Sequence, residues 1–451
     1  MPDQPPLPVH AALHRTPLGL WASLKAARHN LLGILPYIAV KQPMVSGKTG
    51  LRWHMVMDPA AIRHMLLEKL EDYPKSAATK NLLRPAIGES LFVAEGAHWR
   101  WQRRAAAPVF SHRNVTALGP IMQAAAARCA QRIQGQHPAA VDLMDEMVRT
   151  TFDVIADVTF SGEGAFDAAA VHQAIDAYIA DAGKISLLDM IGAPDWLPRP
   201  GRIWARNTVG DMKRVADEAI AARQARGPRD VPDLLDLLLE GEDPETQQKM
   251  NAAELRDNLL TFIVAGHETT ALTLSWALYL CAFDPAVQNR ARQEVLKAIG
   301  NRPIRAEDLP KLPYLRALID ETLRLYPPAG IVSRTAQAAD TLCGREVRPG
   351  DTVMIPIYAL HRHELLWEDP DHFRPERFLD QKPVDRYAYL PFGDGPRICI
   401  GASFAIQEAM IILATLLQSF RFKSIPGRTP KPVMILTLRP EGGVWLTAEP
   451  L

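Results

Sequence analysis

The sequence has few cysteines and no cysteine pair of the kind that binds zinc or builds a disulfide framework. Its 451 residues include four, at Cys129, Cys281, Cys343 and Cys399, far apart and without a CxxC motif. This spacing argues against a zinc or redox-thiol protein and against a disulfide-stapled extracellular domain, so we expect a reducing, cytoplasmic location. Cys129 and Cys281 lie in apolar, helix-like stretches and are expected to be buried thiols.

The sequence also lacks an excess of charge of either sign. Lys plus Arg and Asp plus Glu each number 51, so no overall positive field exists to attract a phosphate backbone. Nucleic acid is therefore not expected as a partner. With 47% hydrophobic and 23% charged residues, the composition is typical of a soluble globular protein with a large core.

Unbroken apolar runs long enough to cross a bilayer are missing as well. The N-terminal residues lack the pattern of a secretory signal. Residues 18–40 are interrupted by Lys25 and Arg28, which predicts a helix and a strand packed on the protein. The most apolar run, Leu259 to Phe283, contains Glu268, which would cost about 2.5–3.5 kcal/mol at a bilayer centre. We therefore expect a buried helix there and no transmembrane segment.

Local patterns predict a mainly α protein with a smaller β region. Leu51 to Met57 alternates apolar and polar side chains, as a strand does, and Asp58-Pro59 then gives the N-cap and first turn of a helix. Residues 114–299 are mostly helical in pattern, with loops expected at 194–202 and 227–232, where Pro and Gly cluster.

The longest helix is expected in the middle of the chain. Asn251 followed by Glu254 has capping-box spacing, so this helix should begin at Ala252 and end before Pro285. After Pro327-Pro328 the pattern changes to short strands around Gly344 and Pro349-Gly350, then to a helix from about Ala402. There is no internal repeat.

The segment PFGDGPRICIG, residues 391–401, places Cys399 between glycines and a basic residue, just before an apolar helix. Glycines allow tight turns and close approach to a flat cofactor. A helix N-terminus and peptide N–H groups would stabilise a thiolate and lower the thiol pKa, which favours metal ligation. A bare cysteine in a glycine loop could be purely structural, but the whole FxxGxRxCxG string favours ligation.

The string AGHETT, residues 265–270, puts polar side chains in the middle of the long apolar helix. Gly266 removes a side chain and Thr269 can hydrogen-bond to a carbonyl in its own turn, which would bend the helix and open a groove for a small ligand such as dioxygen. The alternative is a helix kink or a packing notch. Glu268 and Thr269 together would suit proton transfer to a bound oxygen.

Glu321 and Arg324, in DETLRLYPP, stand three residues apart on one helix face, and Arg377 follows in PERF. The pair could be a solvated ion pair, which contributes only about 0–1 kcal/mol. A buried network that includes Arg377 would instead fix the segment that leads into the Cys399 loop.

Trp99 and Arg103, in GAHWRWQRR, share one helix face. Taken alone they could form a basic surface patch. Together with Arg334 and with Arg397, two residues before Cys399, they are suited to bind a carboxylate.

These signatures occur in the order and spacing found in cytochromes P450, and the chain resembles that family over most of its length, including LPYLRALIDETLRLYPP and HRHELLWEDPDHFRPERF. The resemblance implies a triangular prism-like fold in which residues 1–451 form one catalytic unit with an N-terminal β-containing lobe and a C-terminal α-rich lobe. Haem b would lie between the long central helix and the Cys-bearing loop. The resemblance further implies the following roles: Cys399 as axial thiolate and metal ligand; Thr269 as oxygen-activating alcohol with Glu268 as its acidic neighbour; Trp99, Arg103, Arg334 and Arg397 as propionate contacts; Phe392 and Gly401 in the cofactor loop; and Glu321, Arg324 and Arg377 as a structural triad.

The function implied is a monooxygenase that inserts one oxygen atom of O2 into a hydrophobic substrate. The chain ends shortly after the haem-binding region, so NAD(P)H-derived electrons are expected from separate proteins, a ferredoxin or flavodoxin with its reductase, acting on a monomer. The alternatives are a peroxide-using haem-thiolate enzyme and a haem-binding sensor without turnover. The substrate pocket is expected to draw on five mainly apolar stretches, at 76–92, 187–203, 262–265, 329–332 and near Leu436.

Overall fold

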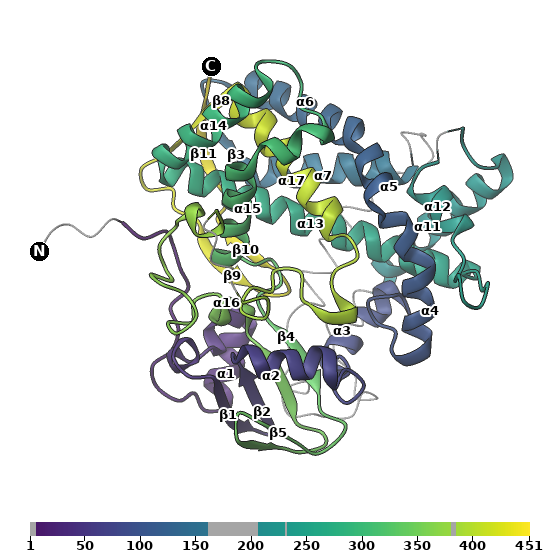
Figure 1. Cartoon of the computed structure of the whole chain (residues 1–451), viewed down its shortest axis with the longest axis vertical. Helices are drawn as coiled ribbons and strands as arrows, with labels where there is room; N and C mark the ends of the chain where they lie inside the picture. The colour runs from purple at the N-terminus through teal and green to yellow at the C-terminus, as the bar shows by residue number, and fades with distance from the viewer. Residues whose placement is uncertain (1–5, 161–205, 231, 380–384) are drawn as a thin grey trace, which may run out of the picture.

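The computed structural model describes residues 6–160, 206–230, 232–379 and 385–451, and most of it is helical (Figure 1). The helices are α1 Leu20–His29, α2 Pro59–Arg63, α3 Ala77–Ile87, α4 Gly96–Ala106, α5 His112–Ala117, α6 Gly119–Gln136, α7 Leu143–Phe160, α11 Arg206–Arg226, α12 Leu234–Glu240, α13 Ala252–Phe283, α14 Pro285–Ile299, α15 Pro313–Leu325, α16 Ile357–Leu360 and α17 Ala402–Ser419. The strands are β1 Met44–Thr49, β2 Leu51–Val56, β3 Ala140–Asp142, β4 Val332–Thr335, β5 Asp340–Leu342, β6 Arg345–Val347, β7 Thr352–Ile355, β8 Phe420–Ser424, β9 Lys431–Met434, β10 Leu438–Glu441 and β11 Trp445–Pro450.

The largest sheet joins the N-terminal hairpin to the middle of the chain. Its strand order is β1-β2-β7-β4, and β2 pairs with β7 in parallel while the other pairs are antiparallel. In Figure 1 this sheet lies with α1 and α2 at the opposite end of the molecule from α6 and α14. An isolated bridge between Lys75 and Arg334 ties β4 to the segment that precedes α3. The sheet thereby brings two basic residues, far apart in sequence, next to each other.

The predicted long helix is confirmed as α13, which runs for 32 residues. The Asn251 side chain accepts a hydrogen bond from the Glu254 N–H, and the Glu254 side chain accepts one from the Asn251 N–H, as the capping box requires. Asp284 caps the next helix, and Pro285 starts it. The helix packs against α7, α17 and α11 in the centre of the molecule (Figure 1).

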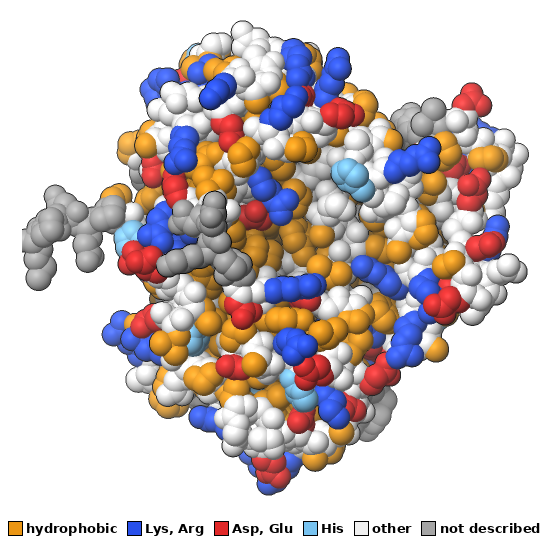
Figure 2. Space-filling view, in the orientation of Figure 1, with side chains coloured by type: hydrophobic (Ala, Val, Ile, Leu, Met, Phe, Trp, Pro, Cys, Tyr) orange, Lys and Arg blue, Asp and Glu red, His pale blue; other side chains and the backbone are white. Residues whose placement is uncertain are grey.

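One contiguous apolar core is formed by side chains from Leu32 to Ala448, and it includes most apolar side chains of α13 and α17. Of the described helices, α17 alone is long and apolar enough by itself to cross a bilayer, and 67% of that stretch is buried inside the protein. The bent pair of α13 and α14 passes the same test, with an angle of 113° between them. Positive and negative side chains are interspersed over the face shown in Figure 2.

Several details differ from the sequence predictions. The strand expected within residues 18–40 is wrong: α1 is followed by two 3₁₀ turns, Leu31–Ile34 and Tyr37–Val40. The Asn30 side chain accepts from the Leu32 N–H and starts the first turn, and Pro36 precedes the second. The short strand β3 and the C-terminal strands β8–β11 were not predicted. The loop expected at 227–232 is confirmed for its described residues, whereas the one at 194–202 lies outside the described residues.

Candidate active site

A cavity of about 1030 Å³ lies between α13 and the loop that carries Cys399. Its wall includes segments far apart in sequence, among them residues 75–92, 99–103, 261–273, 328–335, 390–409 and 434–437. Four of the five stretches expected to form the substrate pocket contribute to it, and the fifth, 187–203, lies outside the described residues. Most of the lining is apolar, with a few polar groups at defined places, which is typical of a site for a hydrophobic ligand.

The loop before α17 presents the Cys399 sulfur to this cavity. Cys399 donates its N–H to the Phe392 carbonyl at 2.9 Å, and Gly395–Arg397 form a 3₁₀ turn capped by Asp394. Gly395 has φ +72°, and a Cβ there would lie 2.4 Å from the Leu66 carbonyl oxygen, so this position requires glycine. Gly401 has an ordinary φ of −89°, but it lines the cavity.

The expectation of a low thiol pKa is not met by the protein groups alone. Burial raises the pKa of Cys399, although the Gly401 N–H and the Arg103 guanidinium lower it in part. Burial also raises the pKa values of the core thiols Cys129 and Cys281, to about 11 and about 12, although Thr150 and Arg132 lower that of Cys129 in part. A bound metal ion would favour the deprotonated form of Cys399, because ligation by sulfur releases the thiol proton.

Three cations near the cavity have no carboxylate within ion-pair distance among the described residues. They are Lys75, Arg103 and Arg334, and Arg334 is only 7% exposed. Burial and the nearby Arg397 lower the pKa of Arg334 to about 10, and burial followed by Arg397 and Arg334 lowers the pKa of Lys75 far below its usual value. Lys75 and Arg334 therefore lie close to Arg397, and buried cations crowded in this way are stabilised by an anion bound between them.

Arg397 differs because it is already paired. It donates to Glu95 and to the Ala94 carbonyl, and its guanidinium stacks 4.4 Å over the buried ring of Trp99. Trp99 in turn lines the cavity. All four predicted residues thus line the cavity: Trp99, Arg103, Arg334 and Arg397.

These residues fit a haem. A sulfur ligand faces a cavity of sufficient size, Gly393 and Gly401 have no atom within 4 Å of where a side chain would begin, and uncompensated cations match two propionates. Cys399 would hold the iron, while Arg103, Arg334 and Trp99 would hold the propionate side. The roles of Phe392, Gly401 and Arg397 would be to shape and position the loop.

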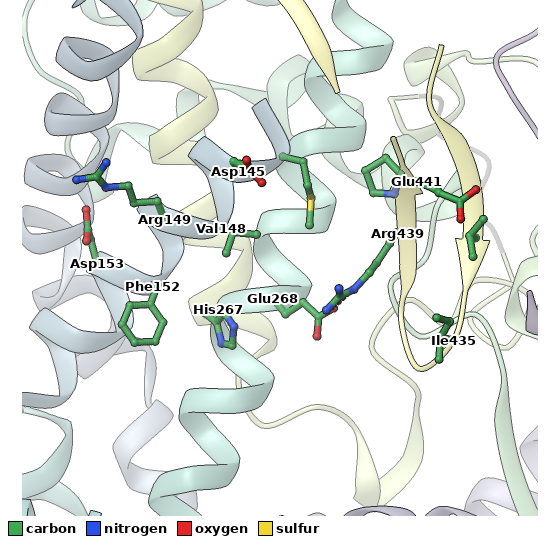
Figure 3. A pocket seen from close by; sticks show the side chains of 13 residues that line it. Asp145, Val148, Arg149, Phe152, Asp153, His267, Glu268, Ile435, Arg439 and Glu441 are labelled. Carbon is green, nitrogen blue, oxygen red and sulfur yellow. Dashed lines mark hydrogen bonds and ion pairs between the residues drawn. The ribbon is translucent and has the colours of Figure 1, made fainter. Parts of the chain in front are cut away.

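Thr269 and Glu268 lie side by side on α13 but are held differently. The Thr269 hydroxyl donates to the Ala265 carbonyl at 2.8 Å, as expected. The carboxylate of Glu268 is 4% exposed and accepts from Thr437 Oγ1 and Arg439 Nε, both at 2.7 Å. Figure 3 shows Arg439 reaching from the β9–β10 hairpin toward Glu268. Both residues line the large cavity, as their predicted roles require.

Glu268 also lines a second pocket of about 680 Å³ on the other side of α13. This pocket lies between α7, α13 and the β9–β10 hairpin (Figure 3). His267, to which the sequence assigned no role, faces it. Its ring contacts Phe152 edge-on, and its Nδ1 lies 2.8 Å from the Ile263 carbonyl.

The predicted network of Glu321, Arg324 and Arg377 is present and buried, so the alternative of a solvated pair is wrong. Glu321 accepts from Arg324 Nε at 2.6 Å and from Arg377 Nε at 3.0 Å. Arg324 also donates to the carbonyls of His361, Pro370 and His372. The network therefore ties α15 to the segment before the Cys399 loop.

Sequence reasoning missed Lys75, Thr437 and Arg439. Lys75 stands in an ordinary loop sequence, and only its bridge to Arg334 brings it to the cavity. Arg439 meets Glu268 across 171 residues of chain. The spacing of residues along the chain does not predict such contacts, because the contacts depend on how distant segments pack together.

The comparisons with known proteins agree with this geometry. The family model described as Cytochrome P450 matches residues 41–447. Cyclooctatin synthase of Streptomyces melanosporofaciens is 32% identical over 82% of this chain and 81% of its own length. Cyclooctat-9-en-7-ol 5-monooxygenase of the same organism is 33% identical over 84% and 82%. Cytokinin hydroxylase of Arabidopsis thaliana is 33% identical over 81% and 72%. The chain belongs to the cytochrome P450 family, and it is a P450 monooxygenase.

Proposed function

We propose that this protein inserts one oxygen atom of O2 into a C–H bond of a hydrophobic organic substrate, with electrons from a separate ferredoxin or flavodoxin and its reductase. The observation that carries the proposal is the Cys399 sulfur in an apolar cavity whose opposite wall is the Thr269 stretch of α13. When bound, haem with a thiolate ligand supplies the activation of dioxygen, because sulfur donation favours O–O cleavage.

The residues of the chain would bind, orient and supply protons. Apolar side chains such as Leu82, Phe262 and Ile331 hold the substrate and exclude water from the cavity. The Thr269 hydroxyl holds a proton at Oγ1 within the cavity, and Glu268 lies beside it in the wall shared with the second pocket. An acid–alcohol pair of this kind favours use of dioxygen over a peroxide-using enzyme or a sensor without turnover.

We further propose that residues 1–451 act as one catalytic unit, as a monomer and in the cytoplasm. The contiguous apolar core that spans both the β-containing and the α-rich parts of the described chain supports the single unit. We also propose that the substrate is a hydrophobic molecule, because the cavity is largely apolar.

Oxygen consumption with a surrogate ferredoxin, its reductase and NADPH tests the proposal. We expect substrate-dependent oxygen uptake, and one labelled oxygen atom in the product when ¹⁸O2 is supplied. Product formed with hydrogen peroxide but not with dioxygen and electrons would contradict the proposal, as would haem binding without any turnover.

Cys399→Ser is the matched test of the metal ligand, with Cys343→Ser as its control. Cys343 is an exposed cysteine in the turn between β5 and β6. We expect the ferrous–carbonyl absorption typical of a thiolate ligand in the wild type and in Cys343→Ser, and its loss in Cys399→Ser.

A further inference from the structure

Glu95 lies at the start of α4, and its carboxylate binds two other segments of the chain. Although Glu95 is the N-cap residue of α4, its side chain makes no bond to that helix, so both carboxylate oxygens are available to other partners. Oε1 accepts from the Lys75 N–H at 2.9 Å, and Oε2 accepts from Arg397 Nη2. One side chain therefore joins the segment before α3, the start of α4 and the Cys399 loop.

The contact with Glu95 fixes how Arg397 lies. Its Nη1 donates to the Ala94 carbonyl at 3.2 Å, its Nη2 donates to Glu95, and its guanidinium lies 4.4 Å over the Trp99 ring. A planar guanidinium with these three contacts has little freedom to rotate. The side chains of Arg397 and Glu95 are 9% and 27% exposed, so water screens this ion pair less than it screens a surface pair.

Glu95 also supplies a negative charge to the buried cations of the cavity wall. Lys75 and Arg334 face each other in an antiparallel bridge, an arrangement in which like charges repel. Burial lowers the pKa of both groups, the nearby Arg397 lowers both further, and Glu95 opposes these effects in each. All three cations line the cavity, whereas Glu95 lies outside its wall. Glu95 therefore balances charge at the cavity without touching what the cavity holds.

We propose that Glu95 is a positioning residue that holds Arg397 flat on Trp99 and, through the charge of its carboxylate, keeps the reduction potential of the bound haem low. Reduction of the cofactor adds one electron. A negative charge nearby disfavours that addition, and an uncompensated cation favours it. The proposal requires haem in the cavity but not the oxygen insertion proposed above, so the two can fail separately.

The reduction potential of the holoenzyme tests the proposal without turnover. Glu95→Gln keeps the shape of the side chain and removes its charge, which leaves Arg397 uncompensated. We expect the ratio of ferrous to ferric protein at a fixed applied potential to rise on the order of tenfold, a shift of about 59 mV for one electron. A potential equal to that of the wild type, or a lower one, would overturn the proposal.

Glu71→Gln is the matched control. Glu71 pairs with Arg100 of α4, but its side chain is mostly exposed, so solvent screens the lost charge and the potential should stay close to the wild-type value. Glu95→Asp retains the carboxylate and should show only a small part of the shift seen in Glu95→Gln. If either of these two variants shifts the potential as far as Glu95→Gln does, the buried carboxylate has no special role and the proposal is wrong.

A double-mutant cycle with Arg397→Gln tests whether Glu95 acts through Arg397. If it does, Glu95→Gln should shift the potential much less once Arg397 has been neutralised, because the two groups are in contact. Additive shifts would contradict the positioning role. Free energies of unfolding are measured in the same variants, since a purely structural Glu95 would change these and leave the potential at its wild-type value.

Arg397→Gln also decides alone if Glu95→Gln fails to fold. It leaves the Glu95 carboxylate without its cation, so the potential should fall below that of the wild type. A rise or no change would overturn the proposal. Failure of the monooxygenase function would be visible separately, as absent oxygen uptake in the wild type.

Discussion

At the scale of single residues, α13 carries two neighbouring side chains with opposite environments. The Thr269 hydroxyl donates to the Ala265 carbonyl of its own turn, and Thr269 lines the cavity. Glu268, one position earlier, is fixed by Arg439 and Thr437 from another element. The helix therefore separates a hydroxyl available to a ligand from a carboxylate that is already bound.

Replacement of Thr269 by Ala should uncouple electron use from product formation. Without the hydroxyl, proton delivery at this place is lost, and we expect product per NADPH to fall on the order of tenfold or more while peroxide rises. Product, peroxide and NADPH oxidation are measured together. Thr415→Ala is the control, because Thr415 makes the same hydrogen bond to the fourth preceding carbonyl, at 2.8 Å, on a part of α17 that does not line the cavity. Equal coupling in both variants would remove Thr269 from this role.

Replacement of Arg439 by Gln should destabilise the fold, because it leaves the buried carboxylate of Glu268 without its cation. Arg439 is itself 36% exposed, so water can compensate in part, and we expect a loss of about 1–2 kcal/mol in the free energy of unfolding. Denaturant unfolding measures it. The double variant with Glu268→Gln should recover most of the loss, and a double variant as unstable as the sum of both changes would contradict the pairing.

Single residues also show where the sequence stops being informative. The ligand Cys399 and the hydrogen bond of Thr269 follow from short motifs, because their geometry is local. The partners of Glu268 do not follow from a motif, because Thr437 and Arg439 belong to another part of the chain whose packing on α13 no motif encodes. The prediction of a low pKa for the Cys399 thiol considered only the local N–H groups, whereas burial, which raises this pKa, depends on the whole surrounding fold.

At the scale of elements, the Glu321 network joins α15 to the segment that precedes the Cys399 loop. Arg377→Ala removes one buried cation of this network and leaves Glu321 incompletely satisfied. We expect a loss of about 3–5 kcal/mol of stability together with poor retention of haem. Arg374→Ala is the control, because the Arg374 side chain makes only partly exposed pairs with Glu368 and Asp369; it should cost no more than about 1 kcal/mol. Similar losses in both variants would contradict a special role of the network.

The loop between Phe392 and Gly401 allows a second test at this scale. Gly395→Ala meets both a positive φ and the Leu66 carbonyl, whereas Gly300→Ala at the end of α14 meets only a positive φ of +64°. We expect Gly300→Ala to cost about 1–2 kcal/mol and Gly395→Ala to cost clearly more, with weaker haem retention. Unfolding and haem content are measured for both, and equal effects would mean that the loop relaxes away from Leu66.

At the scale of the whole molecule, we expect His361 to make the free energy of unfolding depend on pH. Its Nε2 accepts from the Leu390 N–H at 2.8 Å, so the ring is neutral with its proton on Nδ1, facing the Arg324 carbonyl. Burial lowers the pKa of His361 to about 3. The unfolded chain therefore binds a proton below about pH 6.5 that the folded protein excludes until about pH 3.

Stability should accordingly fall as the pH is lowered from about 6.5 toward 3, by up to about 1.4 kcal/mol per unit from this group. Urea unfolding at about pH 7 and about pH 5 measures the slope. His361→Gln keeps an acceptor for the Leu390 N–H and should reduce the slope. The same slope in the variant would assign the acid sensitivity to other groups.

The architecture could be predicted from the sequence to the extent that its signals are strong and local. The capping box at Asn251 and the proline at position 285 define α13 almost to the residue. The strands β8–β11 were missed because each is short, of six residues or fewer, and pairs partly with distant β3. The order of the four-stranded sheet, with β2 parallel to β7, depends on contacts between residues about 300 positions apart.

The assembly of the cavity wall from scattered segments also guides how selectivity could be altered. Residues 76–92 belong to α3 and the turn after it, while the ligand loop at 391–401 belongs to another part of the chain. Mutant libraries restricted to the first segment can therefore change which molecules are accepted without touching the metal-bearing scaffold. Directed evolution of this protein should begin there.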